Sequence, residues 1–380
     1  MQKYLYIIIG MCCSLIFVGC ASNNGSIKEE MTDNKTNITS ETSSSREYAN
    51  GDLIQIQLDD NVEIDAEITI PETLQSLSMK KVKAHRPELD EEEVKNLFLD
   101  EKEIESREVY EGFKCREFGR YDMVSYIEKK GGRLFYEPAN VEYTAPCIDF
   151  LLNCLFTDPL FSSYNLDHYS QTKELSFASK SDIFHKVKTM FESFGVSISD
   201  RYESYALDHK TLQKEENPVD SDGNVMEQAK KDKWTDEDDA YYFILHQEIN
   251  GVPVEQLSYG DGYEGTGIEA TELSAIYGTK GWISFIEDWG YCLEETETEQ
   301  DILSVKDALN SFRKKCDMLL LDQKWTIRDI SLKLLPVFIK DNEYEIRPVW
   351  FFEGTSTDKD QYERSLMILF DGITGKEITT

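Results

Sequence analysis

The sequence of 380 residues predicts an α+β protein in which antiparallel sheets are each packed by a helix. Three observations predict this class. Several segments alternate apolar and polar residues with period two, as strands with one buried face do. A few others place apolar residues at helical spacing behind a capping side chain. In the C-terminal half, a helix followed by antiparallel strands occurs twice, which predicts a duplicated helix-plus-strands module.

The chain begins with a segment that resembles the signal peptide of bacterial lipoproteins. Residues 1–19 combine a positively charged start with an apolar run of about 14 residues, shorter than the ~20 that span a bilayer. The run ends in Phe-Val-Gly before Cys20, which is similar to a lipobox, although Leu usually stands where Phe17 stands. The resemblance implies cleavage before Cys20 and a diacylglycerol on its thiol. An ordinary signal peptide or an uncleaved anchor is the alternative.

Residues 20–50 are almost wholly polar and rich in Ser, Thr, Asn and Glu. Such a segment cannot bury enough apolar surface to offset the entropy lost on ordering, so it is predicted to be a disordered tether. A lipid on Cys20 followed by this tether would hold a folded body off a membrane. The predicted location is therefore the extracytoplasmic face of the cell membrane, with membrane lipid as the partner of the acyl chains.

The overall charge excludes one class of partner. The chain carries 40 Lys and Arg against 73 Asp and Glu, a formal net charge of −33. Such a charge repels nucleic acid phosphates, so DNA and RNA are not expected partners. Hydrophobic residues make up 40% of the sequence, which is enough for the cores of two or three domains once the tether is set aside.

The cysteines that follow residue 20 show no metal or redox motif. They are Cys115, Cys147, Cys154, Cys292 and Cys316. None forms a Cys-x-x-Cys pair, so they are predicted to be small buried hydrophobes. On a helix, seven residues would separate Cys147 from Cys154 by about 10 Å, too far for a disulfide. A long-range disulfide that involves Cys292 or Cys316 stays open for an exported protein.

Residues 51–165 are predicted to form an N-terminal α+β domain. The range contains alternating segments typical of strands, and Lys129-Lys130-Gly131-Gly132 is typical of a hairpin turn. The predicted strands are 54–58, 62–70, 79–84, 121–128 and 133–138. The predicted helices are 90–99, capped by Asp90, and 145–156. The sequence of this domain does not indicate its function.

Residues 166–299 and 300–380 are predicted to be the two copies of the duplicated module. Helices over 179–194 and 304–316 both begin Ser-x-x-Asp, a variant of the capping box. Strand-like segments follow each helix. They are 201–207, 240–249 and 281–286 after the first helix, and 327–337, 343–352 and 366–371 after the second. The acidic segment 215–239 is predicted to be a solvated loop. A chance likeness between the two halves is the alternative.

Three parts of the second half resemble the PepSY-like domains of secreted bacterial proteins. They are Tyr242–Val254, which ends Asn-Gly-Val-Pro-Val, Ile302–Leu309, and the pair Arg347–Phe352 and Leu369–Ile378 with Pro-Val-Trp and Asp-Gly-Ile-Thr-Gly-Lys-Glu-Ile. Similar arrangements occur in extracytoplasmic accessory regulators of sensor kinases and in uncharacterised lipoproteins of anaerobic Gram-positive bacteria. The resemblance covers 166–380 and implies a regulatory role.

Trp350, Phe351 and Phe352 are the candidate residues for a partner surface. Three consecutive aromatics on a strand place rings on both of its faces. One interpretation is core packing. The other is a groove that takes an extended peptide along a sheet edge.

The sequence shows no motif for catalysis or for a cofactor. No nucleophile elbow, zinc-protease, phosphate-loop or dinucleotide fingerprint is present. The five histidines are scattered, and the Asp220–Asn224 segment departs from the calcium-loop spacing. No catalytic residue, cofactor or metal is therefore predicted.

The expected function is that of a lipid-anchored extracytoplasmic protein with a non-catalytic binding or regulatory role. The lipid, the tether and the apparent duplicated modules motivate this expectation, with a peptide or a membrane protein as the partner. The alternatives are an extracellular hydrolase that uses a carboxylate pair and a solute-binding lipoprotein. The sequence identifies neither the ligand nor the pathway.

Overall fold

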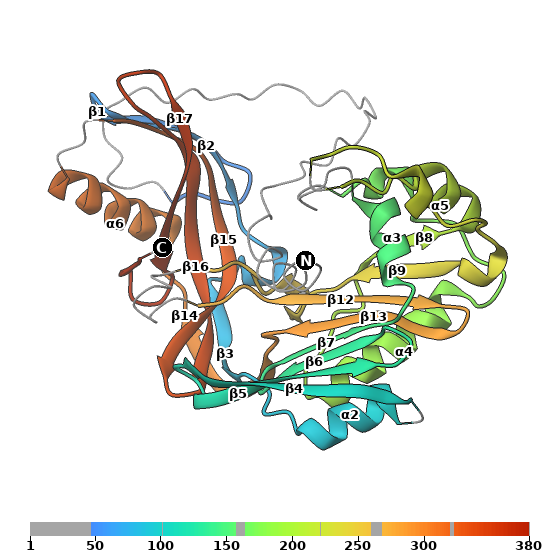
Figure 1. The fold of residues 1–380 in the computed structure, drawn as a ribbon. Coiled ribbons are helices and arrows are strands. Elements are labelled where there is room, and N and C mark those ends of the chain that lie inside the picture. Colours follow the sequence, from blue (N-terminus) through green and yellow to red (C-terminus); the bar gives the residue numbers. More distant parts are fainter. Residues whose placement is uncertain are drawn as a thin grey trace.

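The computed structural model describes residues 47–100, 102–156, 164–220, 222–259, 268–319 and 323–379. The predicted signal peptide, Cys20 and most of the predicted tether lie outside these ranges. Figure 1 shows two large sheets, with sheet A upright on the left and sheet B extending to the right. Helices are few and strands dominate, so the predicted α+β class is confirmed.

Sheet A contains eight strands in the order β1-β2-β15-β16-β17-β18, and β3 joins β14 to one end of β16. The bounds are β1 Leu53–Asp59, β2 Val62–Thr69, β3 Ser78–His85, β14 Cys292–Asp301, β15 Lys324–Lys340, β16 Glu343–Thr357, β17 Glu363–Asp371 and β18 Glu377–Ile378. All pairs are antiparallel except β2 with β15. This parallel pair joins strands from the two ends of the chain.

Helix α6 (Val305–Met318) packs on sheet A. Its Phe312 ring stacks on Phe352 of β16, with ring centroids 4.7 Å apart, and both side chains are fully buried. The helix begins at Ser304, whose hydroxyl accepts from the Asp307 N–H while the Asp307 carboxylate accepts from the Ser304 N–H. The predicted capping box is confirmed.

Sheet B also contains eight strands, in the order β4-β5-β6-β7-β13-β12-β9-β8. The bounds are β4 Ile104–Cys115, β5 Gly119–Glu128, β6 Arg133–Glu137, β7 Asn140–Thr144, β8 Glu203–Leu207, β9 Ala240–Ile244, β12 Glu272–Gly278 and β13 Gly281–Asp288. A separate short hairpin pairs β10 (Glu248–Ile249) with β11 (Val252–Pro253). The Asn250-Gly251 turn expected there is present, with positive φ at both residues.

Helices cover both faces of sheet B. In Figure 1, α2 (Glu91–Leu99) and α4 (Lys180–Ser193) lie below the sheet, and α3 (Ile148–Leu155) and α5 (His209–Glu215) lie above it. The lower helices share one hydrophobic core with the sheet, and the upper helices share another. The Asp90 cap of α2 and the Ser179 cap of α4 are both present, each accepting from a main-chain N–H.

The repeated pattern of a helix followed by antiparallel strands is confirmed. Helix α4 precedes the antiparallel run β8, β9, β12 and β13, and α6 precedes the antiparallel run β15, β16, β17 and β18. Several strands were not predicted, among them β7, β12 and β14. Strand β14 carries a run of charged residues on an exposed segment and therefore lacks the alternation that marks a half-buried strand.

The strand pairing divides the chain differently from the predicted ranges 51–165, 166–299 and 300–380. Strands β1 to β3 belong to sheet A with the C-terminal strands, whereas β4 to β7 belong to sheet B, where β7 pairs with β13. The middle of the chain is therefore inserted between β3 and β14. An alternating pattern identifies the buried face of a strand but not its partner strand, so the sequence did not indicate this arrangement.

Candidate functional site

Trp350, Phe351 and Phe352 do not form a surface. Each of the three side chains is 0% exposed. Trp350 and Phe352 lie in the main core of sheet A, and Phe351 lies in a small core on the opposite face of the sheet. The Trp350 indole N–H donates to the Leu303 carbonyl at 3.0 Å, which satisfies its polar group internally. The core-packing interpretation holds, and the predicted peptide groove at these residues is corrected.

A pocket of about 940 Å³ lies in sheet B, where α2 and α3 meet the ends of the central strands. Its volume is near the upper end of the range for small-molecule sites. Five lysines, four carboxylates and five aromatic rings line it. They are Lys102, Lys129, Lys130, Lys231, Lys280, Glu103, Glu128, Glu237, Asp238, Phe98, Tyr143, Phe150, Trp234 and Trp282. In a chain with a net charge of −33, this concentration of lysine is local.

The first wall of the pocket is the β5–β6 turn, which we call the basic turn (Lys129 and Lys130, with the neighbouring Lys102). Gly131 has a φ of +100°, which side chains rarely adopt. A Cβ on Gly132 would lie 2.5 Å from a carboxylate oxygen of Glu128, so a larger residue there would displace that carboxylate. The Lys-Lys-Gly-Gly sequence thus fixes both the turn and the position of Glu128.

Charged groups of the basic turn are linked by ion pairs with one exception. Lys102 lies 3.0 Å from the Glu128 carboxylate and donates to the Tyr143 hydroxyl, while Lys129 lies 3.0 Å from Glu103. Glu128 is buried, with 5% of its surface exposed. Within the described ranges, no carboxylate pairs with the exposed Lys130. The basic turn therefore has one ammonium group that is free to meet a ligand.

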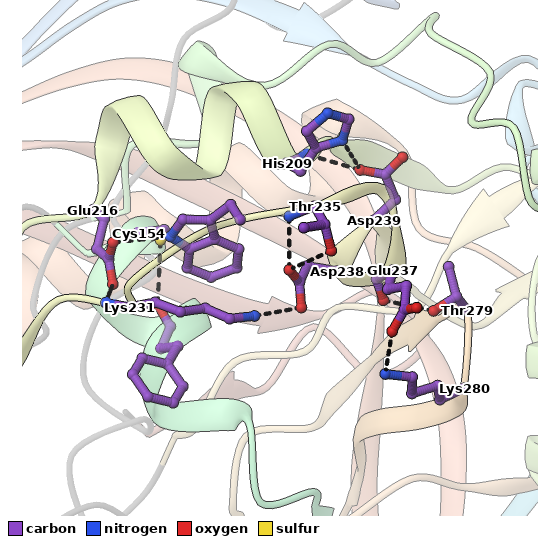
Figure 2. Close-up of polar contacts among 12 residues, drawn as sticks. Cys154, His209, Glu216, Lys231, Thr235, Glu237, Asp238, Asp239, Thr279 and Lys280 are labelled. Atoms are coloured by element: carbon purple, nitrogen blue, oxygen red, sulfur yellow. Dashed lines mark hydrogen bonds and ion pairs between the residues drawn. The ribbon is translucent and has the colours of Figure 1, made fainter.

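The opposite wall is the segment Asp236–Asp239, which we call the acidic turn. Glu216 anchors the chain before it, because its carboxylate accepts from the Lys231 main-chain N–H at 2.7 Å and from the Trp234 indole N–H at 2.8 Å (Figure 2). Both contacts draw the loop against α5. The predicted solvated loop 215–239 is thus exposed in part, yet it is tied down where it lines the pocket.

The acidic turn is fixed to the β12–β13 turn. The Glu237 carboxylate lies 2.8 Å from the Lys280 ammonium, and the Glu237 carbonyl accepts from the Thr279 hydroxyl at 2.6 Å (Figure 2). Asp238 accepts from the Thr235 N–H at 2.9 Å and pairs with Lys231. Burial by itself would raise the pKa of Asp238, but the bonds from Lys231 and Thr235 and the charge of Lys231 together lower that pKa, so Asp238 is ionised at neutral pH.

Aromatic rings form the floor between the two turns. Trp282 of β13 packs edge-on against Phe285, with ring centroids 5.4 Å apart, and edge-on against Tyr277 at 5.0 Å. Phe98 of α2 stacks on Tyr143 at 5.1 Å. These contacts hold the rings from below, because they belong to the core under sheet B. The floor is therefore preorganised to receive an apolar group.

Cys147 lines the pocket and is the one exposed cysteine of the five that the structure describes. It precedes α3, whose first residue is Ile148. Its exposure differs from the predicted buried role. The helix predicted over 145–156 begins at Ile148, so Cys147 precedes the helix and does not belong to its buried face. All five described cysteines are free thiols, so the long-range disulfide left open for Cys292 or Cys316 is not formed. Cys147 thus offers a native reporter for events in the pocket.

A row of acidic side chains lies on sheet B outside the pocket lining. Glu272, Asp288, Asn140 and Glu137 are direct cross-strand neighbours on β12, β13, β7 and the end of β6. The Asn140 amide donates to Asp288 at 2.6 Å and to Glu137 at 3.3 Å. Burial and the Glu142 carboxylate raise the pKa of Glu272 to about 7. Like charges at neighbouring positions disfavour ionisation, which fits this row.

The described residues contain no group of three or more His, Cys, Asp or Glu side chains arranged to hold a metal ion. Two of the histidines pair with carboxylates. His168 pairs with Glu215 and His209 pairs with Asp239, each through a ring nitrogen. In the Asp220–Asn224 segment the Asp220 carboxylate accepts from Asn224 and from the Asp222 N–H, which occupies it within its own turn.

Comparison with known proteins gives the fold a solved counterpart. No protein-family model matches the chain, and no curated protein matches it. Among solved structures, the fold is similar to that of an uncharacterised protein from Eubacterium rectale, with a TM-score of 0.52. The two sequences are 16% identical, and the match covers 86% of this chain and 93% of that chain. At this identity the likeness concerns the fold alone.

Proposed function

We propose that the chain is a lipid-anchored extracytoplasmic binding protein that holds its ligand in the pocket between the basic turn and the acidic turn. The pocket carries the proposal, since it joins an aromatic floor to converging charged groups in a volume of about 940 Å³. The role is binding, with a regulatory consequence where the ligand changes what the protein contacts. PepSY-like modules remain part of this proposal for 166–380.

The proposed location rests on the sequence of the first 50 residues. An apolar run that ends before Cys20 and a polar segment after it support lipidation and display on a tether. Among the helices that the structure describes, none is both long and apolar enough to cross a membrane. In this proposal the diacylglycerol on Cys20 attaches the protein to the membrane.

Lipidation is tested with the full chain produced in a bacterium that carries the lipoprotein pathway. Mass spectrometry of the N-terminal peptide is expected to show a diacylglyceryl group on Cys20, and detergent partitioning is expected to place the protein in the detergent phase. The variant Cys20→Ser should move to the aqueous phase or keep its leader. A wild-type chain that stays in the aqueous phase with residues 1–19 intact would contradict the proposed anchor.

Binding in the pocket is tested through Cys147. We expect at least one class from a panel of short peptides, oligosaccharides and nucleotides to slow the modification of Cys147 by a maleimide about tenfold. Protection follows because the thiol lines the pocket. Cys147→Ser removes the signal and identifies the labelled site. If no class changes the rate at millimolar concentration, the pocket is not the binding site.

The carboxylate-dependent hydrolase remains a second candidate because of one observation. Glu272 and Asp288 are direct cross-strand neighbours, and burial raises the pKa of both. Two neighbouring carboxyl groups whose pKa values are pushed apart can divide the roles of general acid and general base. Hydrolysis of chromogenic glycosides or esters that disappears in both Glu272→Gln and Asp288→Asn would favour this candidate over binding.

A further inference from the structure

A second group of charged side chains lies at the opposite end of sheet B from the pocket, where β12 begins and β13 ends (Figure 1). We call it the acidic row, and it consists of Glu137, Asn140, Glu142, Glu272 and Asp288. Cross-strand partners share one face of a sheet, and Glu142 shares that face with Asn140 two residues before it. The pocket lies beyond Gly278, at the other end of β12. At about 3.4 Å per residue, the row and the pocket are roughly 20 Å apart.

No cation neutralises the acidic row within the described part of the chain. None of its four carboxylates forms an ion pair with a described lysine, arginine or histidine. The Arg133 charge acts to lower the pKa of Glu142, but the Arg133 Nε donates to the Ser125 hydroxyl at 3.1 Å. Burial outweighs that charge and raises the pKa of Glu142, as it does for Glu272 and Asp288. The row therefore consists of acids without a counterion among the described residues.

The Asn140 side chain lacks a hydrogen-bond donor in the middle of the row. This residue is 5% exposed, and its amide nitrogen donates to the Asp288 carboxylate at 2.6 Å and to the Glu137 carboxylate at 3.3 Å. The buried amide oxygen has no partner among the described residues. Turning the amide over would point the oxygen at those two carboxylates, which cannot donate when they are ionised. A buried acceptor without a donor is costly, so this position suits a ligand that donates.

Part of the acidic row is accessible. Glu142, Glu272 and Asp288 are half-buried, whereas Glu137 and Asn140 are buried. The three half-buried carboxylates lie on the adjacent strands β7, β12 and β13. A ligand can therefore meet three carboxylates from solvent and reach the Asn140 amide, which is bonded to one of them.

The chemistry of the row selects an aliphatic ammonium ion. An anion is repelled, and a neutral donor leaves the carboxylates without a counterion. A metal ion does not fit, because the described residues contain no group of three or more His, Cys, Asp or Glu side chains arranged to hold one. A guanidinium presents its donors in one plane and suits a single carboxylate, whereas an ammonium has three donors that can turn towards different strands.

The spacing of the strands sets the length of the ligand. One ammonium fits between Glu272 of β12 and Asp288 of β13, and a second fits at Glu142 and the Asn140 oxygen on β7. In the order β12-β13-β7, these positions are one and a half strand spacings apart, roughly 7 Å at about 4.8 Å per spacing. A chain of four or five methylenes places two ammonium groups about 6–8 Å apart.

We propose that the acidic row is a second binding site, which takes an aliphatic diamine or polyamine with four or five methylenes between its ammonium groups. One ammonium lies between Glu272 and Asp288, and the next donates to Glu142 and to the Asn140 oxygen. This site does not depend on the pocket of the proposed function, because the two lie at opposite ends of sheet B.

Three ligands of matched length test the proposal by calorimetry on the full chain. Diaminopentane has two ammonium groups, pentylamine has one, and diaminopentane with both nitrogens fully methylated keeps both charges but has no N–H group. Diaminopentane should bind about tenfold more tightly than either of the others. Pentylamine loses one charge contact, and the methylated ligand cannot donate to the Asn140 oxygen. Equal affinity for diaminopentane and either of the others would overturn the proposal.

Two variants assign the site. Asp288→Asn and Glu142→Gln each remove one charge and keep the shape of the side chain, so each should weaken the binding of diaminopentane about tenfold. Glu294→Gln removes the same charge from an exposed position on β14 and should leave the affinity unchanged. Both row variants should stay folded, because an amide resembles the protonated acid that burial favours. They lie on different strands, so one still carries the test if the other unfolds. Folded row variants that bind diaminopentane as the wild type does would contradict the assignment.

Cys147 distinguishes the acidic row from the pocket. Diaminopentane should not change the rate of Cys147 modification, because the two sites are roughly 20 Å apart. If it protects Cys147 and binds the row variants unchanged, it occupies the pocket, and the acidic row is not its site. If it does not bind at millimolar concentration, the proposal falls, while protection of Cys147 by another class of ligand still supports the pocket.

Discussion

Arg86 is the residue that ties sheet A to sheet B. Its guanidinium is 1% exposed and lies 3.8 Å from the centre of the Tyr291 ring. It donates to the Thr271 hydroxyl at 3.4 Å and to the Glu269 carbonyl at 3.2 Å. The segments after β3, before β12 and after β13 all pass this point, so one side chain contacts three of the described segments that run between the two sheets.

We expect Arg86→Ala to lower the free energy of unfolding by roughly 3 kcal/mol, since it removes a desolvated cation–π contact and hydrogen bonds from a charged group. Arg328→Ala is the matched control. Arg328 is exposed and pairs with Asp65, so its loss should cost less than about 1 kcal/mol. Urea unfolding of both variants makes the comparison, and equal destabilisation would contradict the role given to Arg86.

The aromatic run of β16 yields a second residue-scale prediction. Phe352→Ala should destabilise the protein by about 3–5 kcal/mol, because the fully buried ring stacks on Phe312 and leaves a cavity. Tyr362→Ala removes an aromatic side chain that is 63% exposed and should have little effect. Thermal unfolding that ranks the two variants equally would argue for an exposed position of Phe352.

At the scale of elements, the helix caps are the best-predicted features. A serine cap depends on contacts within four residues, so the local sequence contains the required information. Both Ser179 and Ser304 accept from the N–H three residues later. Strands with regular alternation, such as β1 and β2, were also predictable. Strand β12 was not, because its Leu273 to Ile276 segment is buried on both faces and shows no alternation.

Ser304→Ala should lower the stability of α6 by about 1 kcal/mol, because the first turn loses the hydroxyl that accepts the Asp307 N–H. Hydrogen exchange of amides in 305–309 should speed up, while amides in α4 should not change. Ser304→Asn, which preserves the cap, should restore the exchange rates. Unchanged exchange in Ser304→Ala would mean that packing alone fixes the helix start.

The candidate site could be predicted only in pieces. The sequence indicated a tight turn at Lys129–Gly132 and an acidic loop over 215–239, and the structure contains both. Their meeting depends on β7 lying between β6 and β13, a long-range pairing that no local pattern specifies. Trp350 to Phe352 show the converse, since a run of aromatics is a local signal that does not distinguish a core from a surface.

The buried carboxylic acids of sheet B make a prediction for the whole molecule. Burial raises the pKa of Glu287 to about 8 and that of Glu272 to about 7, and burial also raises the pKa of Asp288. Groups facing Glu272 are the Asp288 and Glu142 carboxylates and the Ser274 hydroxyl. Folding therefore favours the protonated acids, and the unfolded chain releases these protons more readily.

Stability should consequently rise as the pH falls from about 8 towards 5. An ionised acid in the core costs free energy in the folded state. This cost appears as the pH rises above the pKa that the acid has in the unfolded chain, and it is complete above the pKa that the acid has in the folded protein. Below about pH 4.5, acids with a lowered pKa, such as Asp238, should reverse the trend. Calorimetric melting temperatures across this range test the sign. Glu287→Gln should melt higher than the wild type at pH 8 and equally at pH 5, and a wild-type protein that melts higher at pH 8 than at pH 5 would contradict the account.

The central claim is that the basic turn and the acidic turn form two ends of one binding site. Hydrogen exchange measured with and without the ligand class that protects Cys147 tests it most directly. The account predicts slower exchange in both 128–132 and 231–239, with no change in α6. Protection of one segment alone, or of neither, would contradict it.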